Sequence, residues 1–378
     1  MSVDLSDLSI AVVHEHYYER GGAEYVAETI ARTFDAPIYT GFINQEALPP
    51  VSDQKNLEFY DLFGNRTLSP LVRRYPWFRD FYYQLAWQRL PELTDYDVII
   101  QSGNNPGWYV PPEEQTVVKY VHTTPRTAYD QFHQRADSLV TKLYAYASRV
   151  LYAPNIPYPD RYIANSELVA RRLTRYWGIE DPDVIYPPVD VESYTPLEKS
   201  NFYLSFSRLT ADKRFDEIIN SFREHPDKQL IIGGSGPKEE ELKSLASDMD
   251  NVEFRGYLGE SEKRELLGSA KALVYAAVNE DFGMVPIEAY ASGTPVIGVR
   301  DGYTKYQVND GVTGILYDRG VQSLAEAIDH FHSEGVEMNA NDLVEVAKTY
   351  GIVEFRESMY NVVVSAVKDA QIDAAPDA

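Results

Sequence analysis

The amino-acid sequence predicts an α/β protein of two domains, each built around a parallel β-sheet. The chain has 378 residues, which is more than one compact core usually accommodates. Short β-branched runs alternate with longer helical stretches through both halves of the chain. Near the middle, Tyr186-Pro187-Pro188-Val189-Asp190 interrupts this alternation, because consecutive prolines hold the chain extended.

The first half contains the elements of one such domain. Strands are expected at residues 9–13, 37–39, 97–101, 116–121 and 161–164. Helices are expected at residues 23–33, around 79–89, 138–153 and 167–177. Parallel strands joined by right-handed crossovers form a Rossmann-like domain, which binds ligands at the carboxyl ends of its strands.

The second half repeats the pattern. Strands are expected at residues 202–207, 229–233, 252–255, 272–276 and 295–299, and helices at 215–222, 239–246, 263–269, 286–292, 324–333, 341–349 and 352–369. We therefore predict an N-terminal domain over residues 1–187 and a C-terminal domain over residues 188–350, facing each other across a cleft. Residues 351–368 form a C-terminal helix that can pack back on the first domain, and residues 369–378 a disordered tail.

The charge of the chain limits its partners. The formal net charge is −23, and only 13 of the 35 basic residues are lysines. Such an acidic field disfavours nonspecific nucleic-acid binding. Acid excess with few lysines favours a high-salt cytoplasm, where screening reduces self-repulsion, although an ordinary acidic mesophile is the alternative.

The composition also indicates the cellular compartment and excludes sites that depend on cysteine. The chain has no cysteine, which excludes disulfides, zinc–thiolate sites and thiol nucleophiles. No basic leader precedes the first apolar run, and no apolar stretch approaches the roughly 20 residues that a membrane helix needs. We expect a soluble cytoplasmic protein.

The segment from Glu280 to Ile297 carries the strongest functional pattern. Glu280 follows an apolar strand, Pro286 suits the first turn of a helix, and Gly293 ends that helix. The residues before Pro286 would present free amides to an anion, while Glu280 and Glu288 could each accept paired sugar or ribose hydroxyls. The alternative is that the two carboxylates are ordinary acidic residues near a helix start.

Two further loops follow predicted strands of the second half. Arg208 and Lys213 lie in the first and could neutralise a diphosphate, although a solvated basic loop is the alternative. Gly234 and Gly236 lie in the second and allow a ligand to approach the backbone closely, although a glycine-rich turn alone is weak evidence.

In the first half, Gly21 and Gly22 open a helix and suit contact with phosphate or sugar. His122 follows another strand and begins the run His-Thr-Thr-Pro-Arg; the alternative for His122 is a core-edge histidine. His14 and His16 are interpreted as structural polar residues. No cluster has convincing metal-ligand spacing, so no metal and no cofactor are predicted.

Taken in order, these motifs resemble the large retaining GT-B family called glycosyltransferase family four, over nearly the whole chain. The motifs are Gly21-Gly22-Ala23-Glu24, His122, Tyr186-Pro187-Pro188-Val189-Asp190, Arg208 with Lys213, Gly234 to Pro237, Glu280-x7-Glu288, and Gly311-Val312-Thr313-Gly314. The His-Thr-Thr-Pro-Arg and Tyr-Pro-Pro-Val-Asp runs are similar to members that add mannose in O-antigen-type polysaccharides. This resemblance implies a metal-independent, retaining hexosyltransferase using a nucleotide sugar, with GDP-mannose as the expected donor and a lipid-linked or polysaccharide acceptor.

The resemblance also implies that the N-terminal domain, residues 1–187, binds the acceptor and that the C-terminal domain, residues 188–350, binds the nucleotide sugar. It implies a role for each residue as well. Arg208 and Lys213 would hold the donor diphosphate, Glu280 the sugar hydroxyls and Glu288 the ribose, with His122 beside the sugar. Further donor contacts would come from Gly21, Gly22, Gly234, Gly236, Phe282, Gly283, Met284 and Val285. Tyr306 stands where relatives often have an acid, which puts the details of the ribose and base pocket in doubt.

Two other functions are compatible with the same motifs. One is a nucleotide-sugar epimerase of similar two-domain form, and the other is a catalytically silent nucleotide-sugar binder. Contact with the acceptor or with a membrane surface is assigned to Arg73, Arg74, Arg79 and Arg126. The first three lie within the aromatic and basic segment from Asn65 to Leu90, whose alternative interpretation is a helix that packs in the first-domain core.

Overall fold

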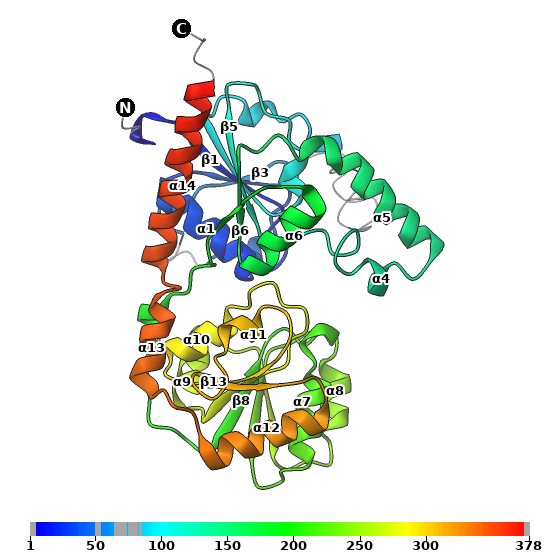
Figure 1. The fold of residues 1–378 in the computed structure, drawn as a ribbon, viewed down its shortest axis with the longest axis vertical. Coiled ribbons are helices and arrows are strands. Elements are labelled where there is room, and N and C mark those ends of the chain that lie inside the picture. Colours follow the sequence, from blue (N-terminus) through cyan, green and yellow to red (C-terminus); the bar gives the residue numbers. More distant parts are fainter. Residues whose placement is uncertain (1–4, 50–53, 64–73, 75–81, 83–84, 374–378) are drawn as a thin grey trace. The chain divides into compact units, whose positions relative to one another are not determined.

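The computed structural model describes residues 5–49, 54–63, 74, 82 and 85–373. The chain divides into two compact units: unit 1 comprises residues 1–187 and 355–378, and unit 2 comprises residues 188–354 (Figure 1). Both units are α/β structures with wholly parallel sheets, as the sequence predicts. None of the helices in the described part of the chain is long and apolar enough to span a membrane.

The sheet of unit 1 has seven strands in the order β3-β2-β1-β4-β5-β6-β7. The central strands β1, β4 and β5 are buried at every position, which explains their nearly continuous apolar sequences. The strands are β1 (Ile10–His14), β2 (Ile38–Thr40), β3 (Phe59–Asp61), β4 (Val98–Ser102), β5 (Thr116–Val121), β6 (Arg161–Ala164) and β7 (Asp183–Val184).

Helices cover both faces of this sheet. Those described are α1 (Gly22–Phe34), α4 (Phe132–Arg135), α5 (Leu139–Tyr152), α6 (Glu167–Trp177) and α14 (Ile352–Asp373), with 3-10 turns η1 (Leu5–Asp7), η2 (Gln45–Ala47), η4 (Pro91–Leu93), η5 (Asn105–Trp108) and η6 (Ala153–Asn155). Residues of α1 and α14 form one core with Val12, Ile100 and Tyr120. Trp87, Trp108 and Trp177 belong to the core on the other face.

Helix α14 begins at the last residues of unit 2 and packs in unit 1 from Phe355 onward. Its apolar residues recur every three to four positions: Phe355, Met359, Val363, Ala366 and Val367 are all buried in the core shared with α1. The two helices lie side by side, and Phe34 of α1 stacks on Tyr360 of α14 with ring centroids 6.4 Å apart (Figure 1). The packing of α14 therefore returns the end of the chain to unit 1.

Helix α14 also extends farther than its sequence predicts. The predicted helix ends at residue 369, whereas α14 ends at Asp373. Val367 is buried and Asp369 pairs with Arg161 of β6, so this part of the expected tail is held in helical form. The expectation of disorder is therefore wrong for residues 369–373, and residues 374–378 lie outside the described chain.

The sheet of unit 2 has six strands in the order β10-β9-β8-β11-β12-β13. The strands are β8 (Phe202–Phe206), β9 (Gln229–Gly233), β10 (Val252–Gly256), β11 (Ala272–Tyr275), β12 (Val296–Val299) and β13 (Gly314–Tyr317). Strands β3, β7 and β13, which the sequence did not reveal, have two to four residues and lie at sheet edges. Strands this short show too little alternation to be recognised.

The helices of unit 2 form two groups. Helices α7 (Phe215–Arg223), α8 (Glu239–Leu245) and α12 (Val321–Glu334) pack on one face of the sheet and form a core with Leu230 and Val274. The second group is α9 (Glu260–Ser269), α10 (Val285–Ala291), α11 (Thr304–Gln307) and α13 (Ala340–Lys348). Short 3-10 turns are η7 (Val191–Ser193) and η8 (Ala211–Lys213).

The packing of α14 leads to a stability prediction. Met359 is fully buried, so Met359→Ala should lower the free energy of unfolding of unit 1 by about 2–5 kcal/mol. Val353 lies on the same helix but is 63% exposed, so Val353→Ala should change it by less than about 0.5 kcal/mol. Denaturant unfolding of both variants tests this, and equal effects would contradict the packing of α14.

Candidate functional site

The first loop of unit 2 follows β8, a central strand of its sheet, and carries Arg208 and Lys213. Arg208 is exposed, whereas the next residue, Leu209, is fully buried. The Leu209 amide donates to the Ser235 carbonyl over 2.9 Å, so the loop is attached to the glycine-rich turn after β9. Arg208 thus stands on an anchored backbone at the carboxyl end of the sheet.

The two glycines of that turn allow the loops to meet. Gly234 has a φ of 114°, and a Cβ atom there would lie 1.8 Å from the carbonyl oxygen of Ser207. A Cβ atom on Gly236 would lie 2.6 Å from the carbonyl oxygen of Leu209. The role that the structure shows for both glycines is close contact with the Arg208 loop, which only a residue without a side chain permits.

Lys213 and Glu280 meet at the same edge of the sheet. The Lys213 Nζ lies 2.5 Å from Glu280 Oε2, and both side chains are largely shielded from solvent. Tyr275, the last residue of β11, donates its hydroxyl to the same oxygen over 3.0 Å. Burial, and then the Glu280 charge, raise the pKa of Tyr275 well above its usual value, so this hydroxyl remains a donor.

Two glycines, Gly283 and Gly302, allow neighbouring segments to pack closely around Glu280. A Cβ atom on Gly302 would lie 2.4 Å from the Glu280 amide nitrogen. Gly283 has a φ of 79°, and a Cβ atom there would lie 3.0 Å from both the Glu280 Cγ and the Tyr275 hydroxyl. The Tyr303 amide donates to the Glu280 carbonyl over 2.9 Å. The segments 279–283 and 301–303 therefore hold the Glu280 carboxylate in place.

Glu288 is held by a second lysine and a second tyrosine. Its Oε1 accepts hydrogen bonds from the Tyr194 hydroxyl over 2.9 Å and from the Lys263 Nζ over 3.0 Å. Burial alone would lower the pKa of Lys263, but the carboxylates of Glu288 and Glu260 outweigh it and raise that pKa. Lys263 therefore stays charged beside Glu288.

In both carboxylates the two donors share one oxygen. Within the described residues, Glu280 Oε1 and Glu288 Oε2 accept no hydrogen bond. A carboxylate oxygen accepts strongly from hydroxyl groups, so each side chain can bind a ligand without giving up its present partners.

The segment between the two carboxylates begins α10. Its N-cap is Met284, and Pro286 lies in the first turn, as predicted. Residues at a helix start have amides without partners inside the helix. Phe282 is buried against the Tyr303 ring, with centroids 5.6 Å apart, so its side chain is structural and only its backbone can serve a ligand.

Residues 301–307, where the sequence departs from the family pattern, contribute a polar contact through Gln307. Tyr306 is half exposed, and its ring lies beneath the Lys305 Nζ. The buried Gln307 donates from Nε2 to the Gly283 carbonyl over 3.0 Å. Gln307 thus fixes the loop before α10, a role that the sequence did not indicate.

Unit 1 also collects polar residues at the carboxyl ends of its central strands. His14 ends β1, Ser102 ends β4, and His122 follows β5. The Ser102 Oγ lies 3.0 Å from His14 Nδ1 and 2.8 Å from His122 Nε2, and so joins the two rings. His14 Nε2 lies 3.7 Å from Glu24 Oε1. We call Glu24, His14, Ser102 and His122 the relay.

The relay connects the predicted glycines to His122. Gly21 is the N-cap of α1, and its amide donates to Glu24 Oε2 over 2.9 Å. Burial would raise the pKa of Glu24, but the hydrogen bond and charge of His14 lower it overall. Burial, then the charge of His14, lowers the pKa of His122 to about 4, so His122 is neutral near pH 7. His14 is therefore a member of this network.

The residues assigned to acceptor or membrane contact are only partly described. Arg126 is half-buried in the turn after β5, and Arg74 is exposed. Arg73 and Arg79 lie outside the described residues, as do Arg66, Tyr75, Trp77, Phe78, Phe81 and Tyr83. Trp87 is fully buried in the unit 1 core, so this aromatic side chain cannot serve a docking surface.

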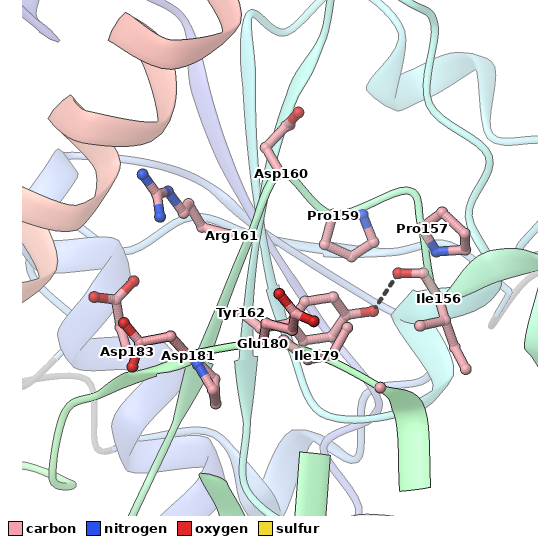
Figure 2. A pocket seen from close by; sticks show the side chains of 12 residues that line it. Ile156, Pro157, Pro159, Asp160, Arg161, Tyr162, Ile179, Glu180, Asp181 and Asp183 are labelled. Atoms are coloured by element: carbon pink, nitrogen blue, oxygen red, sulfur yellow. Dashed lines mark hydrogen bonds between the residues drawn. The ribbon is translucent and has the colours of Figure 1, made fainter. Parts of the chain in front are cut away.

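A separate hollow lies at the opposite end of the unit 1 sheet. Figure 2 shows this space of about 260 Å³, which is lined by residues at the start of β6 and by the loop after α6. Tyr162 and Ile156 both line the hollow, and the Tyr162 hydroxyl donates to the Ile156 carbonyl over 2.8 Å. Arg161 and Asp183 begin their strands, so the hollow is not part of the candidate site.

In the described ranges of the chain, no group of three or more His, Asp or Glu side chains is placed to hold a metal ion. Sequence reasoning missed Tyr275, Tyr194, Lys263 and Ser102. Ser102 directly follows the predicted strand 97–101 and Tyr275 lies next to the end of the predicted strand 272–276, which was the available signal. Tyr194 and Lys263 reach Glu288 from other segments.

Comparison with known proteins finds a similar protein family for each half of the chain. Residues 20–193 match the model of Glycosyltransferase Family 4, and residues 190–349 match that of Glycosyl transferases group 1. A D-inositol 3-phosphate glycosyltransferase of Mycobacterium sp. (strain KMS) is 30% identical over 215 residues, which are 50% of this chain and 49% of that protein. The human Alpha-1,3/1,6-mannosyltransferase ALG2 is 26% identical over 272 residues, covering 60% of this chain and 65% of the relative.

The fold has solved counterparts as well. The crystal structure of Anabaena HepE in complex with UDP-glucose superposes with a TM-score of 0.71 at 18% identity, covering 95% of this chain and all of that chain. The sequence matches span about half the length of the mycobacterial relative, whereas the structural match spans the whole fold. By these matches the first half of the chain is similar to Glycosyltransferase Family 4 and the second half to Glycosyl transferases group 1, and the chain shares its fold with HepE.

Proposed function

We propose that this chain transfers a sugar from a nucleotide-sugar donor that unit 2 binds at the carboxyl edge of its sheet. The observation that carries the proposal is the pair of carboxylates, Glu280 and Glu288, each held at one oxygen by a lysine and a tyrosine. The second oxygen of Glu280 accepts hydroxyls of the transferred sugar, and that of Glu288 accepts ribose hydroxyls. The names of the relatives support a transferase over an epimerase or a silent binder.

The basic residues serve the leaving group. Arg208 is a planar fork that suits diphosphate oxygens, and the Lys213 Nζ lies beside the sugar-binding carboxylate. In the retaining reaction, the bond between the anomeric carbon and the diphosphate oxygen breaks. The acceptor oxygen bonds to that carbon on the same face, and its proton passes to the leaving diphosphate. Fixed cations that stabilise the departing charge supply most of such catalysis.

His122 contributes as a neutral ring. Because its pKa is lowered to about 4, it can donate or accept a hydrogen bond beside the transferred sugar without adding charge. The Ser102 hydroxyl bonds Nε2, which leaves Nδ1 for a ligand. Gly21 and Gly22, at the start of α1, allow a phosphate or sugar to approach the backbone closely.

We further propose mannose from GDP-mannose as the transferred group, without a metal ion. The mannosyltransferase named above supports mannose, whereas the UDP-glucose bound to HepE makes UDP-sugars the competing class. The acceptor is lipid-linked or a polysaccharide and meets Arg126, with Arg73, Arg74 and Arg79 at the membrane surface. The acidic composition fits a cytoplasm of high salt.

The diphosphate assignment predicts the effect of removing each cation. Arg208→Ala and Lys213→Ala should each reduce kcat/KM for the donor by an amount equal to about 1.5–3 kcal/mol, since each loses a charge-assisted contact. Arg223 and Lys243 form surface ion pairs elsewhere in unit 2, so Arg223→Ala and Lys243→Ala are matched controls. Near-normal turnover by both site variants would overturn the assignment.

The relay predicts a positioning role for Ser102. Ser102→Ala leaves two histidine nitrogens without their shared partner, which should lower kcat by about tenfold, equivalent to about 1.4 kcal/mol. Ser221 is equally buried, and its hydroxyl donates to two carbonyls in unit 2, so Ser221→Ala controls for loss of a buried hydroxyl. If the two variants have the same kcat, Ser102 has no part in the reaction.

The donor and the metal requirement are tested together. In buffer with EDTA, GDP-mannose should raise the Tm and be consumed, while UDP-glucose should do neither, because donor binding stabilises the folded state. Consumption of UDP-glucose alone would contradict the donor. Activity that EDTA abolishes and magnesium restores would contradict metal independence, since the cations of unit 2 would then be insufficient.

A further inference from the structure

Helix α5 of unit 1 exposes the apolar side of its sequence. Seven of its large apolar side chains are between 44% and 76% exposed: Leu139, Val140, Leu143, Tyr144, Tyr146, Val150 and Leu151. The side chains turned inward are mostly smaller or polar. Ala145 and Tyr152 are buried, and Thr141 and Ser148 are half-buried. This arrangement is the reverse of an ordinary amphipathic helix of a globular core.

Helical geometry shows that the exposed residues form one continuous face. Positions 141, 145, 148 and 152 follow the spacing of a single inward stripe. Positions 139, 143, 146 and 150 form one outward row, and positions 140, 144, 147 and 151 form the neighbouring row. A contiguous apolar surface of this kind marks a contact with a partner or with lipid.

Within the described residues, α5 makes few contacts with other elements of unit 1. The elements that α5 contacts most are α4 and η6, its neighbours along the chain. Figure 1 shows α5 running along the periphery of unit 1. The helix is attached at its ends and along one narrow stripe, so its outward face is available to a large flat partner.

The charges beside this face are basic. Helix α5 contains Lys142 and Arg149 and no acidic residue, and α4 ends with Arg135; Asp137 lies between the helices. The Arg149 guanidinium lies 5.5 Å from the Tyr146 ring centroid. This excess occurs in a chain of net charge −23. Two copies of a chain with a net charge of −23 repel each other, which disfavours a second copy as the occupant.

We propose that α5 is a membrane-docking helix that lies flat on a bilayer of anionic lipid. Leu143, Val150 and their apolar neighbours enter the boundary between headgroups and acyl chains. Tyr144 and Tyr146 lie at headgroup depth, and Lys142 reaches lipid phosphates along its flexible stem. This surface is distinct from the donor site and goes beyond the proposed transferase activity.

Flotation with vesicles tests the proposal. The chain is mixed with vesicles of equal parts phosphatidylglycerol and phosphatidylcholine. The variant Leu143→Ser/Tyr146→Ser/Val150→Ser should bind at least about tenfold more weakly, because three insertions are lost. The control variant Tyr257→Ser/Val353→Ser/Ile372→Ser removes side chains that are 63–79% exposed elsewhere, and should bind like the parent chain.

Two further measurements separate the contributions to binding. Lys142→Glu should weaken binding at low salt only, whereas binding through the apolar face should persist at high KCl, which screens charge but not apolar burial. A Trp placed by Tyr146→Trp should shift its emission to the blue on vesicles. Donor hydrolysis without vesicles should be unchanged in the triple α5 variant, so failure of docking and failure of the proposed transferase remain distinguishable.

Three outcomes would overturn the proposal. The first is a parent chain that does not float with these vesicles. The second is an equal loss of flotation in the control and α5 variants. The third is a parent chain that is dimeric in analytical ultracentrifugation and becomes monomeric in the α5 variant without a change in vesicle binding, which would show that a second copy covers the face.

Discussion

A parallel sheet gathers the carboxyl ends of all its strands at one edge, and both units of this chain place their candidate site residues there. In unit 2 that edge carries Arg208 after β8, and Tyr275 at the end of β11 with Glu280 just beyond it. In unit 1 it carries His14, Ser102 and His122 on three adjacent strands. Residues more than one hundred positions apart along the chain, His14 and His122, are thereby joined through one hydroxyl.

The carboxyl edges of the two sheets differ in the charges that they carry. In unit 2 each carboxylate is neutralised by a lysine and oriented by a tyrosine, so a charge that is largely shielded from solvent keeps two partners. In unit 1 burial keeps His122 neutral, and only Glu24 at the far end of the relay is an acid. The edge of unit 2 presents paired carboxylates and lysines, and the edge of unit 1 presents a neutral ring.

Glycine has two separate functions in this arrangement. Gly234 and Gly302 make room for neighbouring backbone, since a Cβ atom on either would overlap main-chain atoms. Gly21 caps a helix whose third residue, Glu24, bonds back to its amide. From sequence, Gly21 and Gly234 suggest ligand contact, whereas in the structure Gly234 lies against the Arg208 loop and Gly302 lies against the Glu280 backbone.

The sequence by itself determined the fold class, most strand and helix positions, and the residues Arg208, Lys213, Glu280, Glu288 and His122 as candidates. Those features are local, because hydrophobic periodicity and the residues that end a strand are encoded in short windows. Only the tertiary structure decided that Tyr194 and Lys263 converge on Glu288, that Ser102 joins two histidines, and that α14 continues to Asp373 on unit 1. It also decided that the apolar side of α5 faces outward. Periodicity reveals that a helix has an apolar face, but which neighbour covers that face depends on contacts between distant segments.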